Sequence, residues 1–524
     1  MTGFAGTGPL LRVAVRRDRL MVSVTVILLA VLVAGSDRAT RNLYPSGTHL
    51  PASLLDTMRN PAFVALYGSL PEPASIDAVG VSKTLLPAGL GLAILAQVIV
   101  RRHTRADEES GLAELVGAQI VGRHAALTAA LLLAVGAVAS GAVLAALGLC
   151  LVGSPVAGAV CFALCWVVIG CTGAGLAAVC VQIAGSTRGA GQLGLSALAV
   201  LYLIRMVGDL AAPALTWSSP IGWATKAEPF GANNYWVLGP GLGVCIVLVL
   251  LAYLLRGRRD IGVGLLPQRT GRARGRIAGP AGLTWRLLRG GVAGWLVAFG
   301  ALGVVVGSLT STLTGSADAA VQRMLRSLGG GQGSFIELYL ATEISVCALI
   351  ATAAGISVAG HLATEERARR IDPLLATPLS RRRLLAPYLL WALVLPAALM
   401  LLFALSVWGA DRLTGSRLAL TPLLRSAVAT FPAMWTVVAI SLCLFAIRAA
   451  WMPVSWGVLV LAGTVAQFGG LLSLPGWARS WSPFEHLSAF PADQLNVAAL
   501  GVYLALALIA GAAAVFGFMQ RQIG

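Results

Sequence analysis

Residues 103–123 read HTRADEESGLAELVGAQIVGR, and residues 361–381 read HLATEERARRIDPLLATPLSR. One ungapped offset, 361 − 103 = 258 positions, aligns the two stretches and is close to half of the 524 residues. It pairs His103 with His361, Asp107 with Glu365, Glu108 with Glu366, Glu114 with Asp372, Ala118 with Ala376 and Arg123 with Arg381. We call these charged stretches between long apolar runs the first and second island. Charged side chains are costly in lipid, so each island is expected to lie outside the membrane and contact a partner.

The composition places the rest of the chain in a membrane. Hydrophobic residues make up 57% of the sequence and charged residues 11%, whereas soluble proteins carry about 25% charged residues. Apolar stretches of about 18 or more residues are typical of membrane-spanning helices. The runs lie near 20–36, 84–100, 125–150, 155–183, 190–211, 238–255, 292–312, 336–360, 384–408, 427–447, 452–473 and 497–519. We expect an all-α polytopic membrane protein with about twelve transmembrane helices in two six-helix repeats.

The predicted spans divide six and six around a stretch rich in glycine and arginine that begins at Arg256. Its lack of apolar periodicity is typical of a linker. We expect a first half over 1–258, a cytoplasmic linker over 259–280 and a second half over 281–524. An even number of spans gives both halves the same orientation, so a pseudo-twofold axis along the membrane normal is expected to relate them.

Arginines concentrate on the side that carries the islands, which predicts that this side is cytoplasmic. Both termini fall there, so we expect a multi-pass protein of the bacterial plasma membrane with cytoplasmic termini. The first apolar run follows four arginines and has no small-residue cleavage site, which favours a retained span over a signal peptide. The net charge of +17 favours membrane lipid with anionic headgroups as a partner. Nucleic acid is not expected as a partner, because the basic residues are spread over loops at span ends.

Two further kinds of segment recur in both halves. Residues 10–19 and 283–289 mix apolar and cationic side chains before the first span of each half, as an interfacial helix would. Residues 217–223 and 481–486 place tryptophan near Ser-Pro between the fifth and sixth spans. This composition suits the outer headgroup level, and we expect both segments to dip into the membrane as short broken helices.

The second island has the pattern of a short amphipathic helix. Ile371, Leu374 and Leu375 stand at i, i+3 and i+4, which makes one apolar face. The glutamates at 365–366 fall in the first turn, where carboxylates are favourable, and Pro378 ends the helix or begins the next one. An apolar face framed by charges suits docking into a groove of another protein. A solvated loop is the alternative interpretation.

Residues 365–383 resemble the intracellular segment of ABC transporter type-2 permeases. That family's pattern runs Glu-Glu, Gly-Arg or similar, an acidic residue, and Leu-Leu-Ala-x-Pro-Val-Ser-Arg. The matching positions are Glu365, Glu366, Asp372, Leu374, Leu375, Ala376, Pro378, Ser380 and Arg381. Ala368-Arg369 stands where Gly-Arg is usual, and the first island departs further, with Gly117, Ile120 and Gly122 in place of Leu, Pro and Ser. Residues 259–267 are similar to the mid-chain linker of fused, two-half members, and the layout most resembles exporters of polyketide antibiotics of the tetronasin-resistance type.

The resemblance implies a type V exporter fold, in which the island after the second span of each half forms a coupling helix. It also implies separate ABC ATPase subunits, two copies of one protein, which would carry the ATP and Mg²⁺. The residues expected to contact them are Glu108, Glu109, Glu114, Arg123, Glu365, Glu366, Asp372, Leu374, Leu375, Pro378 and Arg381. The transported compounds would be hydrophobic or amphipathic small molecules such as antibiotics.

The chain is not expected to be an enzyme. It contains no Gly-x-x-x-x-Gly-Lys-Ser/Thr loop, and its only lysines are Lys83 and Lys226. The Gly-rich residues 327–333 are expected on the outer side, away from ATP. The five histidines are scattered, and the eight cysteines lie in or beside apolar runs, where cysteine packs as a small hydrophobe. We expect no catalytic residue, no bound cofactor and no metal site.

Four polar residues in the predicted spans are candidates for a substrate pathway or gate. Ionisable residues within spans cost on the order of 2.5–3.5 kcal/mol each. The candidates are Arg205, Asp209, Glu343 and Gln467. Arg205 and Asp209 stand at i and i+4 and can pair on one helix face. A structural ion pair near the outer headgroups is the alternative for this pair.

Together these patterns predict the transmembrane permease subunit of an ATP-driven exporter. The alternative is a 6+6 proton-driven secondary multidrug transporter, which also has parallel halves. That class needs a Gly-x-x-x-Asp-Arg-x-Gly-Arg type of loop after its second and eighth spans, and the sequence contains none there. A membrane scaffold or sensor without transport is the third interpretation.

Overall fold

The structure is a computed structural model that describes residues 3–44, 50–59, 61–118, 121–210, 212–260, 262–266, 279–313, 335–415, 418–468, 476–479, 481–485 and 496–521. In this part of the chain every regular element is helical, and eleven helices are long and apolar enough to cross a membrane. The prediction of an all-α polytopic membrane protein is confirmed. The Gly-rich residues 327–333 and most of the expected linker 259–280 lie outside the described residues.

Contacts divide the chain into two compact units, Met1–Gly271 and Arg272–Gly524, which we call the first and second unit. The long helices of the first unit are α1 (Thr7–Leu43), α4 (Ile76–Arg101), α7 (Ala125–Val152), α8 (Val156–Ile183), α9 (Thr187–Leu210) and α12 (Leu238–Gly257). Its short helices are α2 (Ala52–Arg59), α3 (Pro61–Tyr67), α5 (Asp107–Glu109), α6 (Leu112–Gly117), α10 (Pro213–Thr216) and α11 (Pro220–Lys226).

The second unit repeats this order of long helices. It contains α13 (Gly279–Leu313), α15 (Phe335–Arg367), α16 (Asp372–Leu375), α17 (Arg381–Leu413), α18 (Leu420–Ala429), α19 (Phe431–Ile447), α20 (Val454–Phe468), α21 (Gly476–Arg479) and α22 (Val497–Gln520). Most of these helices match a predicted span. The run predicted over 452–473 is α20, whose 15 residues are fewer than the roughly 20 that a straight span needs; residues 469–473 lie outside the described part.

Two of the predicted short segments have a different form from the one expected. Residues 10–19 and 283–289 are not separate interfacial helices, because each continues without a break into the first span of its unit, α1 or α13. Residues 217–223 lie at α10 and α11, and Ile221 is fully buried against the core of the first unit. Among residues 481–485, Phe484 is buried in the core of the second unit.

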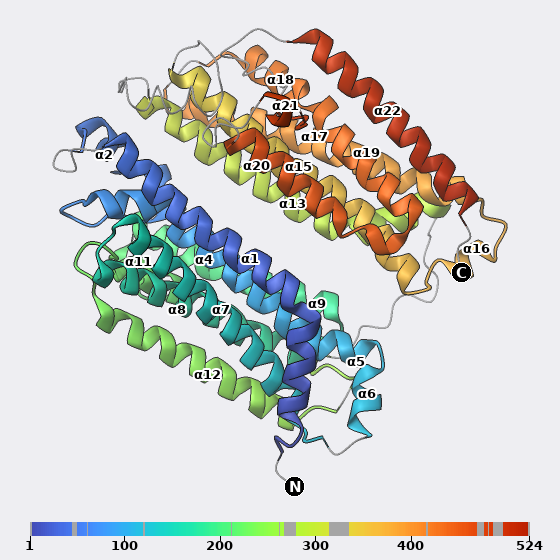
Figure 1. The fold of residues 1–524 in the computed structure, drawn as a ribbon, viewed down its shortest axis with the longest axis horizontal. Coiled ribbons are helices and arrows are strands. Elements are labelled where there is room, and N and C mark those ends of the chain that lie inside the picture. The colour runs from blue at the N-terminus through green and yellow to red at the C-terminus, as the bar shows by residue number, and fades with distance from the viewer. Residues whose placement is uncertain are drawn as a thin grey trace. The chain divides into compact units, whose positions relative to one another are not determined.

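Helix α8 is the centre of the first unit and packs against α4, α7, α9 and α12 (Figure 1). Its sequence is apolar around the whole circumference, which is typical of a buried helix, and Phe162, Trp166 and Ile169 are fully buried. A Cβ at Gly173 would lie 2.5 Å from the backbone oxygen of Ala93, so only glycine allows α4 to approach this closely. In the second unit α19 lies between α15 and α22 in the same way.

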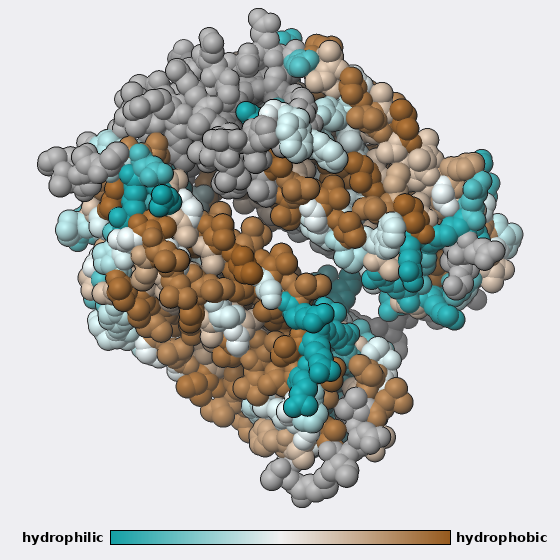
Figure 2. Space-filling model, viewed as in Figure 1, coloured by the Kyte–Doolittle hydropathy of each residue, from teal (hydrophilic) through white to brown (hydrophobic). Residues whose placement is uncertain are grey.

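The outward faces of the long helices are apolar. Figure 2 shows hydrophobic residues covering the helices and hydrophilic residues gathered near their ends. Val31, Ile246 and Leu254 are each at least 60% exposed, and large contiguous apolar surfaces of this kind need a cover in a soluble protein. Lipid supplies that cover for a polytopic membrane protein.

Away from the islands, each unit joins its first and third long helix through a buried carboxylate. In the first unit, Asp37 of α1 is fully buried and accepts a hydrogen bond of 2.9 Å from the Ser154 hydroxyl beyond α7. In the second unit the first long helix supplies the hydroxyl and the third supplies the carboxylate. Thr310 of α13 donates over 2.6 Å to Asp411 at the end of α17. The backbone N–H of Leu418 also donates to Asp411, over 2.9 Å.

We predict that Asp411→Ala destabilises the protein by about 1–3 kcal/mol for each donor that loses its acceptor. The hydroxyl of Thr310 and the amide of Leu418 would both lose theirs. The midpoint of thermal unfolding of the purified protein in detergent measures the effect. Asp260→Ala is the matched control, because Asp260 is exposed; equal midpoints for the two variants would contradict the assigned role of Asp411.

Candidate functional site

The first island starts where α4 leaves the apolar zone. Helix α4 continues directly into a π-helical turn, Arg102–Ala106, and then into α5. Such turns are rare and are frequent at functional sites. We call Asp107, Glu108 and Glu109 the acidic triplet. Each of its three carboxylates contacts a different part of the first unit.

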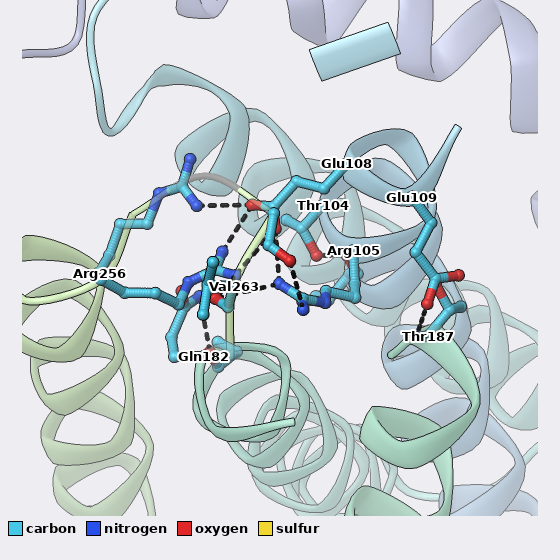
Figure 3. Close-up of polar contacts among 12 residues, drawn as sticks. Thr104, Arg105, Glu108, Glu109, Gln182, Thr187, Arg256 and Val263 are labelled. Atoms are coloured by element: carbon cyan, nitrogen blue, oxygen red, sulfur yellow. Dashed lines mark hydrogen bonds and ion pairs between the residues drawn. The ribbon is translucent and has the colours of Figure 1, made fainter. Parts of the chain in front are cut away.

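Glu108 is the centre of an ion-pair cluster, which Figure 3 shows. Its side chain is almost fully buried, and three arginines surround the carboxylate. Arg259 binds both oxygens, with Nη1–Oε2 of 2.8 Å and Nη2–Oε1 of 2.5 Å. Arg256, at the end of α12, reaches Oε1 at 2.6 Å, and Arg105 reaches Oε2 at 2.8 Å. A bidentate arginine–carboxylate pair is strong and fixes the geometry.

The cluster holds one negative and three positive charges, and backbone oxygens accept hydrogen bonds from some of the remaining donors. Arg105 Nη2 donates to the carbonyl of Gly262 over 3.1 Å, and Arg259 Nη1 donates to the carbonyl of Val263 over 2.9 Å. Removing one partner of a buried ion pair leaves an uncompensated charge, which is strongly destabilising. Glu108 is therefore the one carboxylate on which the three guanidinium groups depend.

Residues 262–266, which were predicted to belong to the linker, pack against the first unit. The backbone N–H groups of Leu265 and Leu266 donate to the carbonyls of Gln182 and Ile183 at the end of α8, over 3.1 and 3.0 Å. A Cβ at Gly264 would fall 2.5 Å from the backbone nitrogen of Gly185, so this close approach requires glycine. The first part of the expected linker is thus fixed beside the ion-pair cluster.

The other two members of the acidic triplet contact two further helices. Glu109 accepts a hydrogen bond of 2.7 Å from the backbone N–H of Thr187, the first residue of α9 (Figure 3). Asp107 forms an ion pair of 2.9 Å with Arg17 of α1. The triplet therefore joins the end of α4 to α9, α1 and the segment after α12.

A second buried carboxylate strengthens the connection with α1. Asp18 is 1% exposed and lies 2.7 Å from both Arg102 Nη1 and His103 Nε2. His103 therefore has a position-fixing role at the helix end. Its counterpart His361 lies 4.0 Å from Glu365 in the same helix, so the two histidines differ in their contacts.

The second island contacts the last helix of its own unit. The carboxylate of Glu366 forms an ion pair with Arg521, directly after α22. The Arg521 guanidinium also lies over the ring of Phe445 at 5.2 Å and over that of Phe518 at 5.9 Å, which supports a cation–π contribution. Glu108 and Glu366, which occupy equivalent positions in the two islands, thus each bind an arginine at the end of the sixth span.

The last residue of each island contacts the same arginine from the other side. Arg123 Nη2 donates over 3.1 Å to the backbone carbonyl of Arg259, and Arg381 Nη1 donates to the carbonyl of Arg521. We call this arrangement the two-point contact: the glutamate binds the side chain of the terminal arginine, and the closing arginine of the island binds its carbonyl. It occurs in both units with the same residue types.

Between these fixed ends, other predicted contact residues remain at the surface. In α6, Leu112 is 41% and Leu115 72% exposed, and Glu114 is exposed beside them. In the second island Asp372 and Pro378 are exposed. These exposed positions are among those in the two islands that can meet another protein.

The apolar stripe of the second island faces inward in part. Ile371 is 2% exposed within the core of the second unit, and Leu374 and Leu375 pack partly against that core. The prediction that this stripe as a whole enters a groove of a partner is therefore wrong for Ile371. The reason is that a helix of only four residues cannot turn its full apolar face away from the unit that carries it.

Arg205 and Asp209 form a buried structural pair. Arg205 is fully buried; it lies 3.2 Å from Asp209 and donates to the carbonyls of Val64 and Ala65 at the end of α3, over 3.2 and 2.8 Å. A cation is favourable at a helix carboxyl terminus. Asp209 also accepts a hydrogen bond from Thr216 of α10 over 3.0 Å. The pair therefore joins α3 and α10 to α9.

The remaining candidates, Glu343 and Gln467, belong to the second unit. Glu343 is half-buried in α15, one turn before Cys347. Gln467 lies in α20, and its side chain is outside the described part of the structure.

Within the described residues, no group of three or more histidine, cysteine or acidic side chains could hold a metal ion. Cys161 and Cys165 are free, buried thiols that contact the carbonyls of Ala227 and Ala224.

Sequence reasoning missed the arginines that complete the two-point contacts. Arg256, Arg259 and Arg521 were assigned only to the charge balance between the two sides of the membrane. Their position directly after the sixth span of each half was the available signal. Nothing in the sequence showed that this end would return to the island after the second span.

Two comparisons with known proteins agree on a relationship. Residues 277–519 match the family described as "Multidrug efflux system permease Rv1217c, C-terminal domain". The chain is 34% identical over 493 residues to the "Multidrug efflux system permease protein Rv1217c" of Mycobacterium tuberculosis (strain ATCC 25618 / H37Rv). That similarity covers 93% of this chain and 89% of the relative, so it includes both islands and both units.

We predict that Glu108→Gln lowers the free energy of unfolding by about 3–5 kcal/mol, because the neutral amide leaves three guanidinium groups without their counter-charge. The midpoint of thermal unfolding in detergent reports the loss. Glu109→Gln serves as the matched control; its carboxylate accepts one exposed hydrogen bond, so a cost below about 1 kcal/mol is expected. A Glu108→Gln midpoint as high as that of the control would show that the cluster adds little stability.

For the Arg205–Asp209 pair we predict that Arg205→Ala lowers the free energy of unfolding by about 3–5 kcal/mol, because the buried Asp209 carboxylate loses its counter-charge. The double variant Arg205→Ala with Asp209→Ala should recover part of that loss, because no isolated charge remains. A double-mutant cycle on unfolding midpoints measures the coupling. Full stability in Arg205→Ala, combined with loss of export, would instead favour a direct role in the substrate pathway.

Proposed function

The chain belongs to the Rv1217c family of multidrug efflux system permeases, and from this premise we propose that it is the transmembrane subunit of an ATP-driven exporter of the ABC type-2 class. It would move hydrophobic or amphipathic small molecules, including antibiotics of the polyketide type, out of a bacterial cell. The observation that carries the proposal is the repeated two-point contact, which fixes an island to the last span in each unit. Because the two-point contact occurs once in each half, it suits a partner ATPase of two equal subunits.

In this proposal the islands are coupling elements on the cytoplasmic side. Both chain termini also lie on that side. Two copies of a separate ATPase would bind them, one for each island, and would hold the ATP and Mg²⁺; this chain would bind no cofactor. At the first island, exposed Leu115 and Leu112 offer an apolar anchor beside Glu114. Exposed apolar side chains with a charged rim are typical of protein contact sites.

In this proposal Glu108 and Glu366 transmit motion from the islands to the last spans. Glu108 and Glu366 are engaged with arginines of their own units, so we assign them to transmission. Motion of an island would pull on its terminal arginine at two points. The sixth span, α12 or α22, would then move with the second span, α4 or α15. An ion pair with one favoured geometry keeps the island and the last span in a fixed relation, so the two would move together.

The proton-driven alternative predicts a different energy source. A secondary transporter needs protonatable groups along its pathway, and several buried carboxylates among the described residues are engaged: Asp18, Asp37, Asp209 and Asp411 each accept hydrogen bonds or form ion pairs. This engagement favours the ATP-driven reading. Both alternatives are transporters, and they differ in the energy source.

Inside-out vesicles that contain this chain and its cassette ATPase should accumulate a lipophilic drug when ATP is added. We predict that accumulation persists after a protonophore abolishes the proton gradient, and that Leu115→Asp lowers it roughly tenfold by removing an apolar anchor of the ATPase contact. Fluorescence of the accumulated drug measures the rate.

Leu151→Asp is the matched control, because Leu151 is 87% exposed at the end of α7 that lies away from the islands. It should keep the rate of the unmodified chain. Accumulation that stops with the proton gradient and ignores ATP would replace the proposal by the secondary transporter.

A further inference from the structure

At the island end of the first unit, α4 and α9 border a cationic groove whose lining residues include no acidic side chain. Its lining includes Gln97 and Arg101 of α4, Gly191 and Leu195 of α9, and Val181 of α8. Arg101 is half-buried. No hydrogen bond or ion pair joins its guanidinium to another residue that the structure describes, whereas its neighbour Arg102 is paired with Asp18. An arginine stays charged in any protein environment, so this site is suited to an anion.

The groove is built around the guanidinium. A Cβ at position 191 would lie 1.8 Å from Arg101 Nη1, so a larger residue there would displace the guanidinium from this position. One turn away, the Gln97 amide is held by a hydrogen bond of 3.1 Å to the carbonyl of Gly194. Two polar side chains at i and i+4 of α4 therefore point into a seam of small residues on α9.

Beside the cation, the groove is apolar and open at the surface of the first unit. Ile94 is 42% and Leu195 45% exposed, and both line the groove. The apolar run of α4 ends at Val100 and charged residues follow, which places Arg101 at headgroup depth for a spanning helix. A charged head would meet Arg101, and an apolar tail would lie along Ile94 and Leu195.

The second unit lacks this site. The offset of 258 positions places Ala359 opposite Arg101 and Gly355 opposite Gln97. Ala359 is fully buried, and a Cβ at Gly355 would lie 2.7 Å from the backbone oxygen of Ala392, so α17 occupies the space. The cationic groove is thus a property of one half of the chain.

We propose that Arg101 and Gln97 form a binding site for one amphipathic anion, a molecule with a phosphate or carboxylate head and an apolar tail. Two sources offer this chemistry: an anionic membrane lipid and an acidic amphipathic compound among the transported molecules. The site is independent of the energy source of transport, so its test needs no ATPase.

The experiment uses the full chain, purified in neutral detergent, and counts bound phosphatidylglycerol by native mass spectrometry. Dioleoylphosphatidylglycerol should give one tightly bound molecule per chain, and Arg101→Gln should lower its occupancy at least tenfold. Arg101→Lys should keep part of it, because the charge remains. Arg16→Gln is the control: it removes an exposed arginine from the same end of the unit and should leave the tightly bound molecule in place.

Two further probes separate the sources. Dioleoylphosphatidylcholine, which has the same tails and no net charge, should not occupy the site. Oleate tests a carboxylate head: displacement of phosphatidylglycerol by oleate assigns the site to acidic amphiphiles in general, and failure to displace assigns it to a phosphate headgroup. Equal occupancy of phosphatidylglycerol in Arg101→Gln and Arg16→Gln, with both variants folded by thermal midpoint, would overturn the proposal.

Discussion

Each half of this protein carries a glutamate just beyond its second span, and an arginine just beyond its sixth span neutralises it. The carboxylate has left the apolar zone but is still enclosed by helices, where an unpaired charge would cost several kcal/mol. Glu108 meets Arg256 and Arg259, and Glu366 meets Arg521. This requirement brings together two chain segments about 150 residues apart (256 − 108 = 148 and 521 − 366 = 155). The island conformation, the end of the last span and the segment after α12 all follow from it.

The two halves meet the same requirement by different means. The first half surrounds its carboxylate with three arginines and closes the cluster with the carbonyls of 262–263. The second half uses one arginine and places it over two phenylalanine rings. Its island also buries Ile371, whereas α6 of the first island leaves Leu115 at the surface. The islands are therefore equivalent in their attachment and unequal in the surface that they present.

Much of the fold was predictable because lipid imposes a simple pattern. Spans need long apolar runs, islands interrupt them, and a repeated island implies a repeated half; these rules located most of the long helices. Ranges such as 10–19 were misjudged, because a cationic segment before a span and a separate interfacial helix have the same composition. For the run at 452–473 the described residues show α20, Val454–Phe468, and hydropathy does not show where a helix ends.

The candidate site was predictable in part. Glu108 and Glu366 were identified as important from the repeated islands, but their ion pairs with arginines of the same unit were not predicted. Charge alone cannot distinguish an exposed carboxylate from one that a distant arginine covers, and these arginines lie far along the chain from their glutamates. Arg205 with Asp209 was recognisable from the i, i+4 spacing. The contacts of Asp18 were not, because its partners Arg102 and His103 come from another part of the chain.

The docking of residues 259–266 has a consequence for how the two halves could be separated. A cut after residue 258 would appear natural from hydropathy, but it would remove Arg259 from Glu108 and the carbonyls of 262–263 from Arg105. A cut after Leu266 leaves every one of those contacts within the amino-terminal fragment. Judged by these contacts, the boundary between the halves therefore lies beyond Leu266. If the two halves were expressed as separate chains, the first chain would need to include residues 259–266.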